Sequence, residues 1–172
     1  MKKLLLLTIG LLIVPLQSSL ANSIILWDVK PDLIFIFVYA LGLIYNEEKA
    51  MLMGAGLGFV SDVFSGGPLG LNLLTKGITG FASGLLGKRA INMRLSLQIL
   101  VIFFITIIEV LAQVILIGIS SRGAAPAIWI KAGFLQALYN SLFAFLFFWP
   151  LIKRLKRERE WAGSLKESIL IR

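Results

Sequence analysis

Long apolar runs broken by short polar stretches dominate the pattern of this 172-residue chain. A helix needs about 20 residues to cross a hydrocarbon core of about 30 Å, so the chain has room for about six crossings. We predict an all-α polytopic membrane protein, a six-transmembrane-helix bundle forming one domain over residues 1–152, with a basic cytoplasmic tail over residues 153–172. The predicted spans are residues 4–26, 33–45, 50–64, 69–87, 95–119 and 127–152.

The second and third apolar segments are short, and a single fused span is the alternative to two helices. Fusion would bury Glu47, Glu48 and Lys49. Each charge near the centre of a membrane helix costs about 2.5–3.5 kcal/mol on insertion scales. A tight helical hairpin is therefore the better prediction.

The first segment has two interpretations. Lys2 and Lys3 precede an apolar run, and Ser19-Leu20-Ala21 resembles the small residues of a signal-peptide cleavage site. Cleavage after residue 21 would leave five spans. Apolar character resumes over residues 24–27, which makes the segment long enough to cross, and we expect a retained helix.

Composition and charge agree with a membrane location. The chain is 58% apolar and only 15% charged, and its mean hydropathy is +0.91. With the N-terminus inside, the cytoplasmic segments hold 13 of the 17 Lys and Arg residues, and the opposite side holds three. This bias predicts cytoplasmic N- and C-termini in a multi-pass protein of the inner membrane. The net charge of +8 then indicates contact with anionic lipid, and not with nucleic acid.

The residue inventory leaves little material for catalysis. The sequence has no cysteine and no histidine, which excludes thiolate nucleophiles, disulfides, Cys/His metal sites and imidazole catalysis. No pair of Ser, Lys, Asp or Glu residues stands at a recognised catalytic spacing. We expect a protein that is not an enzyme and that holds no metal or cofactor.

Glycines form seams on the third and fourth segments when residues are placed 100° apart. Small residues let helix backbones approach closely, which holds membrane bundles together. The seams are expected to serve helix packing or to receive a partner. They consist of Gly54 and Gly58 on the third segment, and Gly77, Gly80, Gly84 and Gly87 on the fourth.

Polar residues share one face of the fifth segment: Gln98, Thr106, Glu109, Gln113 and Ser120. Glu109 lies near the segment's centre, where a carboxylate needs a cation, several donors or a proton. Gln136 and Asn140 on the sixth segment could hydrogen-bond to Glu109. One hypothesis is a hydrogen-bonded lock between these two spans, and the other is a route or pocket for a solute or proton, with Asn72 as a further contact. The protonation of Glu109 is left open.

The turn between the third and fourth segments carries an acidic residue. Gly66 and Gly67 allow the chain to reverse, and Pro68 suits the first position of the next helix. Asp62 is expected to accept hydrogen bonds from the free amides of that helix. A salt bridge from Asp62 to Lys76 is the alternative that helical spacing leaves open.

The region around this turn carries a series of motifs. They are Pro31-Asp32-Leu33, the glycines Gly54, Gly56 and Gly58, then Asp62, Ser65-Gly66-Gly67-Pro68-Leu69-Gly70-Leu71 and the glycine-rich fourth segment. With these motifs the chain resembles the MreD family of rod-shape-determining membrane proteins. The resemblance covers residues 31–87 specifically and about residues 1–155 loosely, and Lys76 lies outside the family pattern.

The resemblance implies a non-enzymatic component of the bacterial cell-elongation (Rod) complex, or elongasome. Such proteins bind MreC in the inner membrane and work with MreB, RodA and a class B penicillin-binding protein in peptidoglycan synthesis that sets cell shape. A second copy of the chain is a further candidate partner. The family is also similar in architecture to the S components of energy-coupling-factor transporters. A substrate-binding subunit of a small-molecule (vitamin) transporter is therefore the alternative function.

Overall fold

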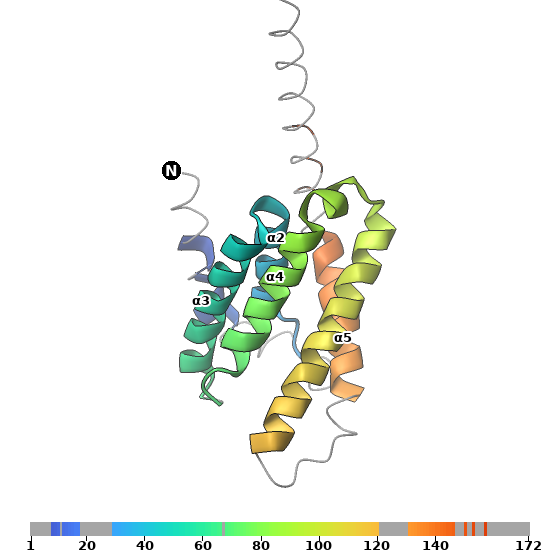
Figure 1. The fold of residues 1–172 in the computed structure, drawn as a ribbon. Coiled ribbons are helices and arrows are strands. Elements are labelled where there is room, and N and C mark those ends of the chain that lie inside the picture. The colour runs from blue at the N-terminus through green and yellow to red at the C-terminus, as the bar shows by residue number, and fades with distance from the viewer. Residues whose placement is uncertain are drawn as a thin grey trace, which may run out of the picture.

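The chain folds into a bundle of helices joined by short turns in a computed structural model (Figure 1). The structure describes residues 8–10, 12–17, 29–66, 68–120, 131–146, 150, 153 and 157. The labelled helices are α2 (Leu33–Ile44), α3 (Glu47–Ser65), α4 (Leu71–Asn92) and α5 (Leu95–Ser120). Residues 8–10, 12–17 and 131–146 are also helical. The predicted all-α class is confirmed for the described residues.

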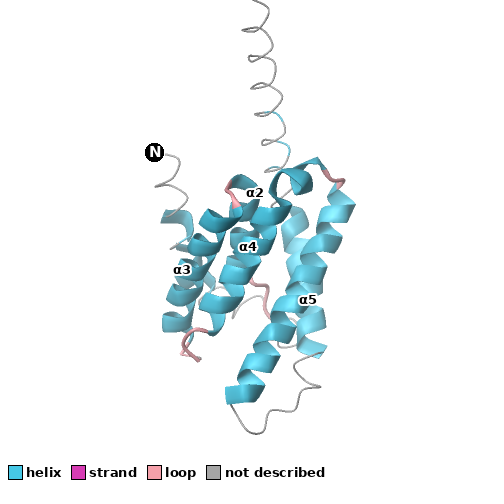
Figure 2. Cartoon of the chain, viewed as in Figure 1, coloured by secondary structure: helices cyan, strands magenta, loops and turns pink. Residues whose placement is uncertain are grey.

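Helix α2 is the central helix of the bundle. It is apolar on all sides, as expected for a helix surrounded by protein. Its side chains enter two hydrophobic clusters, one with the end of α4 and the start of α5, and the other with α3 and the N-terminal helical residues. At about 1.5 Å per residue, its 12 residues cover only about 18 Å. The helix therefore begins inside the bundle, and Figure 2 shows the preceding loop at mid-height.

The break between α2 and α3 lies at Tyr45 and Asn46, so the predicted hairpin is present and a fused helix is excluded. Helix α3 begins at Glu47, three residues before the predicted start. Glu47 and Glu48 occupy its first turn, where negative charge complements the positive end of the helix dipole. This favourable position explains why the charged residues start the helix instead of remaining in a loop.

The glycine seams of α3 and α4 face one another. A Cβ atom added to Gly54 or Gly58 would overlap backbone of α4 at Lys76 or Asn72, and one added to Gly80 would overlap Ala50 of α3. At Gly84 the overlap would be with Glu47. These glycines thus allow α3 and α4 to pack backbone to backbone. They are covered by the facing helix and offer no free surface to a partner.

Two other seam glycines behave differently. Gly77 is buried, but an added Cβ would make only ordinary contact with Ala55, at 3.4 Å. Gly87 has φ 21° and ψ −106°, which interrupts the helical geometry of α4. Beyond this kink, α4 continues to Asn92, five residues past the predicted end. Gln98 then donates to the carbonyl of Ala90, which ties the start of α5 to the end of α4.

The turn between α3 and α4 differs from the prediction at Pro68. Gly66 (φ 64°) ends α3, and Gly70 (φ 94°) is the N-cap of α4, so both adopt left-handed backbone that favours glycine. Pro68 was expected at the first helical position, but it lies outside the helix and accepts a hydrogen bond from the Leu71 amide at 3.3 Å. Gly67 lies outside the described residues.

The outward surface of the bundle is apolar. Large exposed side chains recur along the outer faces of α3, α4, α5 and residues 131–146, including Leu52, Ile78, Ile108 and Leu142. Among the described helices, Leu95–Gly118 is long and apolar enough to cross a membrane by itself. Thr8–Gln17 and Leu33–Ile44 are apolar but shorter. Six membrane-crossing helices therefore remain a prediction. The cleavage question at residue 21 lies outside the described residues.

Candidate functional site

A buried lysine lies between two carboxylates in the middle of the bundle. Lys76 on α4 is 1% exposed, and its Nζ donates to Asp32 Oδ2 and to Glu109 Oε1. The same nitrogen lies 5.6 Å from the centroid of the Phe35 ring, within the range of a cation–π contact. An ammonium group withdrawn from water is costly unless it is paired and hydrogen-bonded. The two carboxylates provide that pairing and join α4 to α5 and to the start of α2.

Asp32 is shared between Lys76 and the first turn of α2. Its Oδ1 accepts a hydrogen bond from the Phe35 amide at 2.9 Å, which makes it the N-cap of α2. Its Oδ2 accepts from Lys76. The positive end of the α2 dipole favours negative charge at this position. Asp32 thus both caps the start of α2 and pairs with the buried Lys76 ammonium.

The other free amides at this buried helix start also find side-chain partners. The Asp32 amide donates to Asn140 Oδ1 at 2.8 Å, and the Ile34 amide donates to Gln17 Oε1 at 3.0 Å. Backbone groups inside a membrane must be satisfied within the protein, because the hydrocarbon offers no partner. Gln17 and Asn140 therefore allow α2 to begin in the interior.

Asn140 connects the cluster to residues 131–146. Its Nδ2 donates to Thr106 Oγ1 on α5 at 3.4 Å, while the Thr106 hydroxyl donates to the carbonyl of Ile102 at 2.9 Å. We refer to Asp32, Lys76, Thr106, Glu109 and Asn140 as the polar core. Each of these residues is at most 8% exposed. The polar core links α2, α4, α5 and residues 131–146.

The structure brings together only part of the lock predicted between the fifth and sixth spans. Glu109 and Asn140 both belong to the polar core, but they act through Lys76 and through Asp32 and Thr106. Gln113 and Gln136 lie outside it and line a cavity nearer the end of α5. The predicted lock involved only the fifth and sixth spans. The structure adds Lys76 of α4, which pairs with Glu109, and Asp32 at the start of α2, which pairs with Lys76.

Asp62 fixes the hairpin of α3 and α4. Its Oδ1 accepts from the Asn72 amide and from Asn72 Nδ2, each at 2.9 Å. Its Oδ2 accepts from the Gly70 amide at 2.9 Å and from the Leu73 amide at 3.1 Å. These contacts satisfy the first free amides of α4. The capping contact expected from the turn sequence is therefore present, and the Asn72 side chain is part of it instead of lining a pocket.

The alternative salt bridge between Asp62 and Lys76 is wrong. Asp62 binds the start of α4, whereas the Lys76 side chain reaches Asp32 and Glu109. Lys76 lies more than a turn inside α4, and the packing of α2 against α4 brings Asp32 to it. A partner 44 residues away in sequence thus replaces the nearer candidate.

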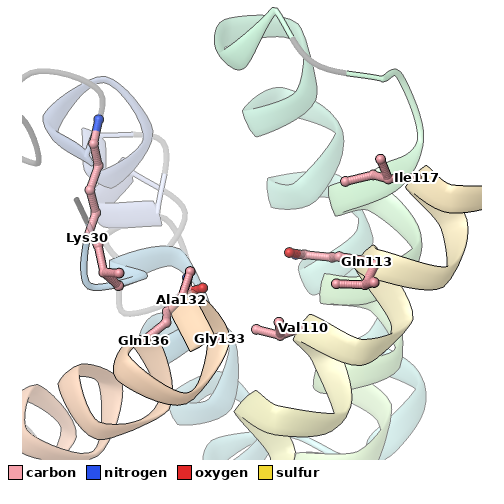
Figure 3. Close-up of a pocket in the computed structure, with 9 residues that line it drawn as sticks. Lys30, Val110, Gln113, Ile117, Ala132, Gly133 and Gln136 are labelled. Atoms are coloured by element: carbon pink, nitrogen blue, oxygen red, sulfur yellow. The ribbon is translucent and has the colours of Figure 1, made fainter. Parts of the chain in front are cut away.

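A separate cavity of about 210 Å³ lies between the last turns of α5, the start of residues 131–146 and the segment before α2 (Figure 3). Its walls combine apolar side chains with two carboxamides and one lysine. The lining residues are Val29, Lys30, Val110, Gln113, Val114, Ile117, Ala132, Gly133 and Gln136. The polar core does not line this cavity.

The sequence pattern did not predict the contact between Asp32 and Lys76 in the polar core. Asp32 is part of the Pro31-Asp32-Leu33 motif, and Asp62 is the only partner that helical spacing offers Lys76. An Asp directly before an apolar helical run is a typical N-cap signal. Together with the short second segment, that signal could have placed Asp32 at a buried helix start.

The charged groups of the polar core bind one another. In the part of the chain that the structure describes, no group of three acidic side chains comes together to hold a metal ion. The Lys76 ammonium is hydrogen-bonded to both carboxylates beside it. The polar core is thus arranged to hold four helical elements in one register.

Comparison with known proteins identifies the family. The family model for rod shape-determining protein MreD matches residues 1–158. No curated protein matches the chain, and no solved structure matches it. Because the family model covers most of the sequence, the chain belongs to the MreD family of rod-shape-determining membrane proteins.

Proposed function

We propose that this protein is a non-enzymatic scaffold of the bacterial cell-elongation machinery that binds MreC in the inner membrane. In this role it helps to organise peptidoglycan synthesis along the cell cylinder, together with MreB, RodA and a class B penicillin-binding protein. The observation that carries the proposal is the family match over residues 1–158. Rod-shape determination is the function of that family.

The polar core supports a scaffold because its charged groups bind one another. Lys76 is held by Asp32 and Glu109, and Asp32 is also held by the first turn of α2. A solute or proton route would need polar groups turned towards a passage. The cavity at the end of α5 is lined by other residues. We therefore interpret the polar core as a lock that keeps the bundle rigid.

The apolar outer surface supports helix-to-helix binding within the membrane. The packing of α3 on α4 covers the seam glycines Gly54, Gly58, Gly80 and Gly84. The transmembrane helix of MreC would therefore pack on outward faces of the bundle, where residues such as Leu52, Ile78 and Ile108 are more than half exposed. Such packing depends on van der Waals contact, since lipid supplies no hydrophobic drive between helices.

The proposed topology has several spans, with both termini in the cytoplasm. The excess of Lys and Arg on one side supports this arrangement. The α3–α4 turn and the α4–α5 turn lie at opposite ends of the bundle in Figure 1. We place the α3–α4 turn on the outer side and the α4–α5 turn, with Arg89 and Arg94, in the cytoplasm.

Co-purification from detergent-solubilised membranes tests the proposal. Tagged protein is expected to retain MreC, and MreC whose transmembrane helix is replaced by an unrelated one is expected to be lost. Depletion of the protein is expected to turn rods into spheres. Failure to retain MreC while the protein remains monodisperse and folded would count against the proposal.

The transporter-subunit alternative has no support from the comparisons. Pockets that enclose drug-sized ligands typically measure about 300–1,000 Å³, and the cavity at the end of α5 measures about 210 Å³. This volume is small for a site that encloses a whole vitamin. We therefore do not propose a transport function.

A further inference from the structure

The cavity at the end of α5 presents two carboxamides to a ligand and, among its described lining residues, no available charge. Gln113 lies on α5 and Gln136 on residues 131–146, and both are half-buried. Lys30 also lines the cavity, but Figure 3 shows its ammonium group turned away from the two carboxamides. Lys30 has another interaction in the protein. The cavity therefore offers hydrogen bonds without offering a cation.

The two carboxamides are not used by the fold. In the part of the chain that the structure describes, the side chains of Gln113 and Gln136 make no hydrogen bond. Asn140, one turn beyond Gln136, makes two such bonds inside the polar core. In Figure 3 the Gln113 oxygen points from α5 across the cavity towards residues 131–146. Because a carboxamide has both donors and an acceptor, this pair suits a group that also donates and accepts.

The walls around the carboxamides are apolar. They include Val110 and Val114 on α5 and Ala132 on residues 131–146. A Cβ atom added to Gly133 would overlap Val110 at 2.3 Å, so the two helical elements approach closely at one boundary of the cavity. Pockets with mostly apolar walls and a few convergent polar groups are typical ligand sites.

Depth in the membrane favours a lipid-like ligand. The apolar stretch Leu95–Gly118 has 24 residues and covers about 36 Å, slightly more than a hydrocarbon core of about 30 Å. Gln113 lies about 7.5 Å from Gly118 along this helix, at about 1.5 Å per residue. The cavity is therefore near the edge of the hydrocarbon core, next to the headgroup region. Polar groups at this depth need partners in the protein or in a bound amphiphile, because hydrocarbon offers none.

Volume and charge limit the ligand. An engineered cavity of about 150 Å³ holds benzene, so about 210 Å³ accommodates a small polar headgroup and not a complete lipid. An ionised phosphate is costly to bury without a cation, which disfavours phospholipid headgroups. A hydroxyl group carries no charge and both donates and accepts. The glycerol end of a diacylglycerol has this chemistry, and its acyl chains would remain in the surrounding bilayer.

We propose that this cavity binds the hydroxyl-bearing glycerol end of an uncharged amphiphile of the diacylglycerol class. The carboxamides of Gln113 and Gln136 hydrogen-bond to the hydroxyl group, and the apolar walls contact the carbon atoms beside it. The site is separate from the polar core and does not depend on MreC binding. It would make the bundle sensitive to the neutral-lipid content of the membrane.

Native mass spectrometry of protein in mixed micelles that contain equal amounts of dioleoylglycerol and its methyl ether tests this site. The two lipids have the same acyl chains, and only dioleoylglycerol has a free hydroxyl group. The wild type is expected to retain dioleoylglycerol about fivefold to tenfold better, the effect of one hydrogen bond. Gln113→Met and Gln136→Met keep the side-chain length but remove the carboxamide, so each should remove most of this preference. Asn92→Met is the matched control, since it removes an exposed carboxamide from the end of α4 that does not line the cavity.

An excess of free glycerol separates two sources of the hydroxyl group. Retention of dioleoylglycerol supports a lipid ligand, whereas its displacement would assign the site to a soluble polyol and overturn the proposal. Each variant is first checked for wild-type thermal unfolding, and the two lipids on the wild type decide alone if the variants fail to fold. Equal retention of both lipids by the wild type would show that the carboxamides contact only water, and the proposal would be wrong. Equal losses in Gln113→Met and Asn92→Met would also contradict it.

Discussion

Lys76 on α4 and Glu109 on α5 form an ion pair in the centre of the bundle, and Asp32 at the start of α2 contacts the same ammonium group. The arrangement holds two carboxylates against one cation. Removal of the cation and removal of one carboxylate should therefore have unequal effects. The first leaves two acids unpaired, and the second leaves one balanced pair.

Lys76→Met is expected to destabilise the protein strongly. Breaking a buried ion pair by removing one partner costs about 3–5 kcal/mol, because the remaining charge is left unpaired. Thermal unfolding in detergent measures the effect. Lys49→Met is the matched control, since Lys49 is exposed near the start of α3 and the substitution removes the same charge. Equal stability of the two variants would show that the ion pairs of Lys76 do not stabilise the folded protein.

The Asp62 cap should be sensitive to loss of its acceptor oxygens. Asp62→Ala removes four hydrogen bonds and leaves the amides of Gly70, Asn72 and Leu73 without this partner. We expect a loss of about 2 kcal/mol in unfolding free energy, which is typical of a lost cap with partly buried donors. Asn72→Ala, which removes one side-chain bond only, should cost less. Thermal unfolding that ranks Asn72→Ala as the more damaging change would contradict this assignment.

The glycine seam offers an internal comparison. Gly58→Ala and Gly80→Ala place a Cβ against backbone of the facing helix, so each should cost about 1–3 kcal/mol through overpacking. Gly56 lies on the same helix as Gly58 but has open space around its Cα. Gly56→Ala should leave stability unchanged or raise it by up to about 1 kcal/mol, because alanine is the better helix former. Chemical unfolding in mixed micelles would distinguish the three variants, and a uniform response would argue against close α3–α4 packing.

The proposed topology can be tested by cysteine labelling, because the natural chain contains no cysteine. Leu69 is 75% exposed in the α3–α4 turn, and Arg94 is exposed in the α4–α5 turn. A membrane-impermeant maleimide should label Leu69→Cys in intact spheroplasts and should label Arg94→Cys only after lysis. The reverse pattern would invert the topology, and labelling of both before lysis would contradict the single crossing by α4 between them.

The sequence was sufficient to predict the helices α2, α3, α4 and α5 but not the contacts between their polar faces. Helical periodicity placed Gln98, Thr106 and Glu109 on one face of α5, and all three are buried. Turn chemistry located Asp62 at the α3–α4 hairpin. Both predictions depend on local geometry, which a sequence pattern encodes directly.

The partners of Lys76 could not be predicted in this way. Helical spacing made Asp62 a candidate, because it lies near in the chain, while Asp32 is brought to Lys76 by the packing of α2 on α4. Pro68 was also misplaced, since Gly70 caps α4 and moves the helix start to Leu71. Gln113 and Gln136 share a polar face with the core residues but lie towards the end of the bundle, where the cavity opens. Helical periodicity predicts which face of its helix a residue occupies. The depth of that residue in the bundle and the side chains that it contacts depend on how the helices pack together.

The central claim is that the polar core is a structural lock of a rod-shape scaffold, and not a proton or solute route. Glu109→Gln tests it most directly. The substitution keeps an oxygen that can accept from Lys76 and leaves Lys76 paired with Asp32. Cells in which this variant replaces the native protein should be examined by microscopy, with MreC co-purification and protein abundance measured in parallel. The account predicts rods, wild-type abundance and retained MreC. Spherical cells despite a folded, abundant variant that still binds MreC would contradict it and would assign the carboxyl group of Glu109 a direct role in function.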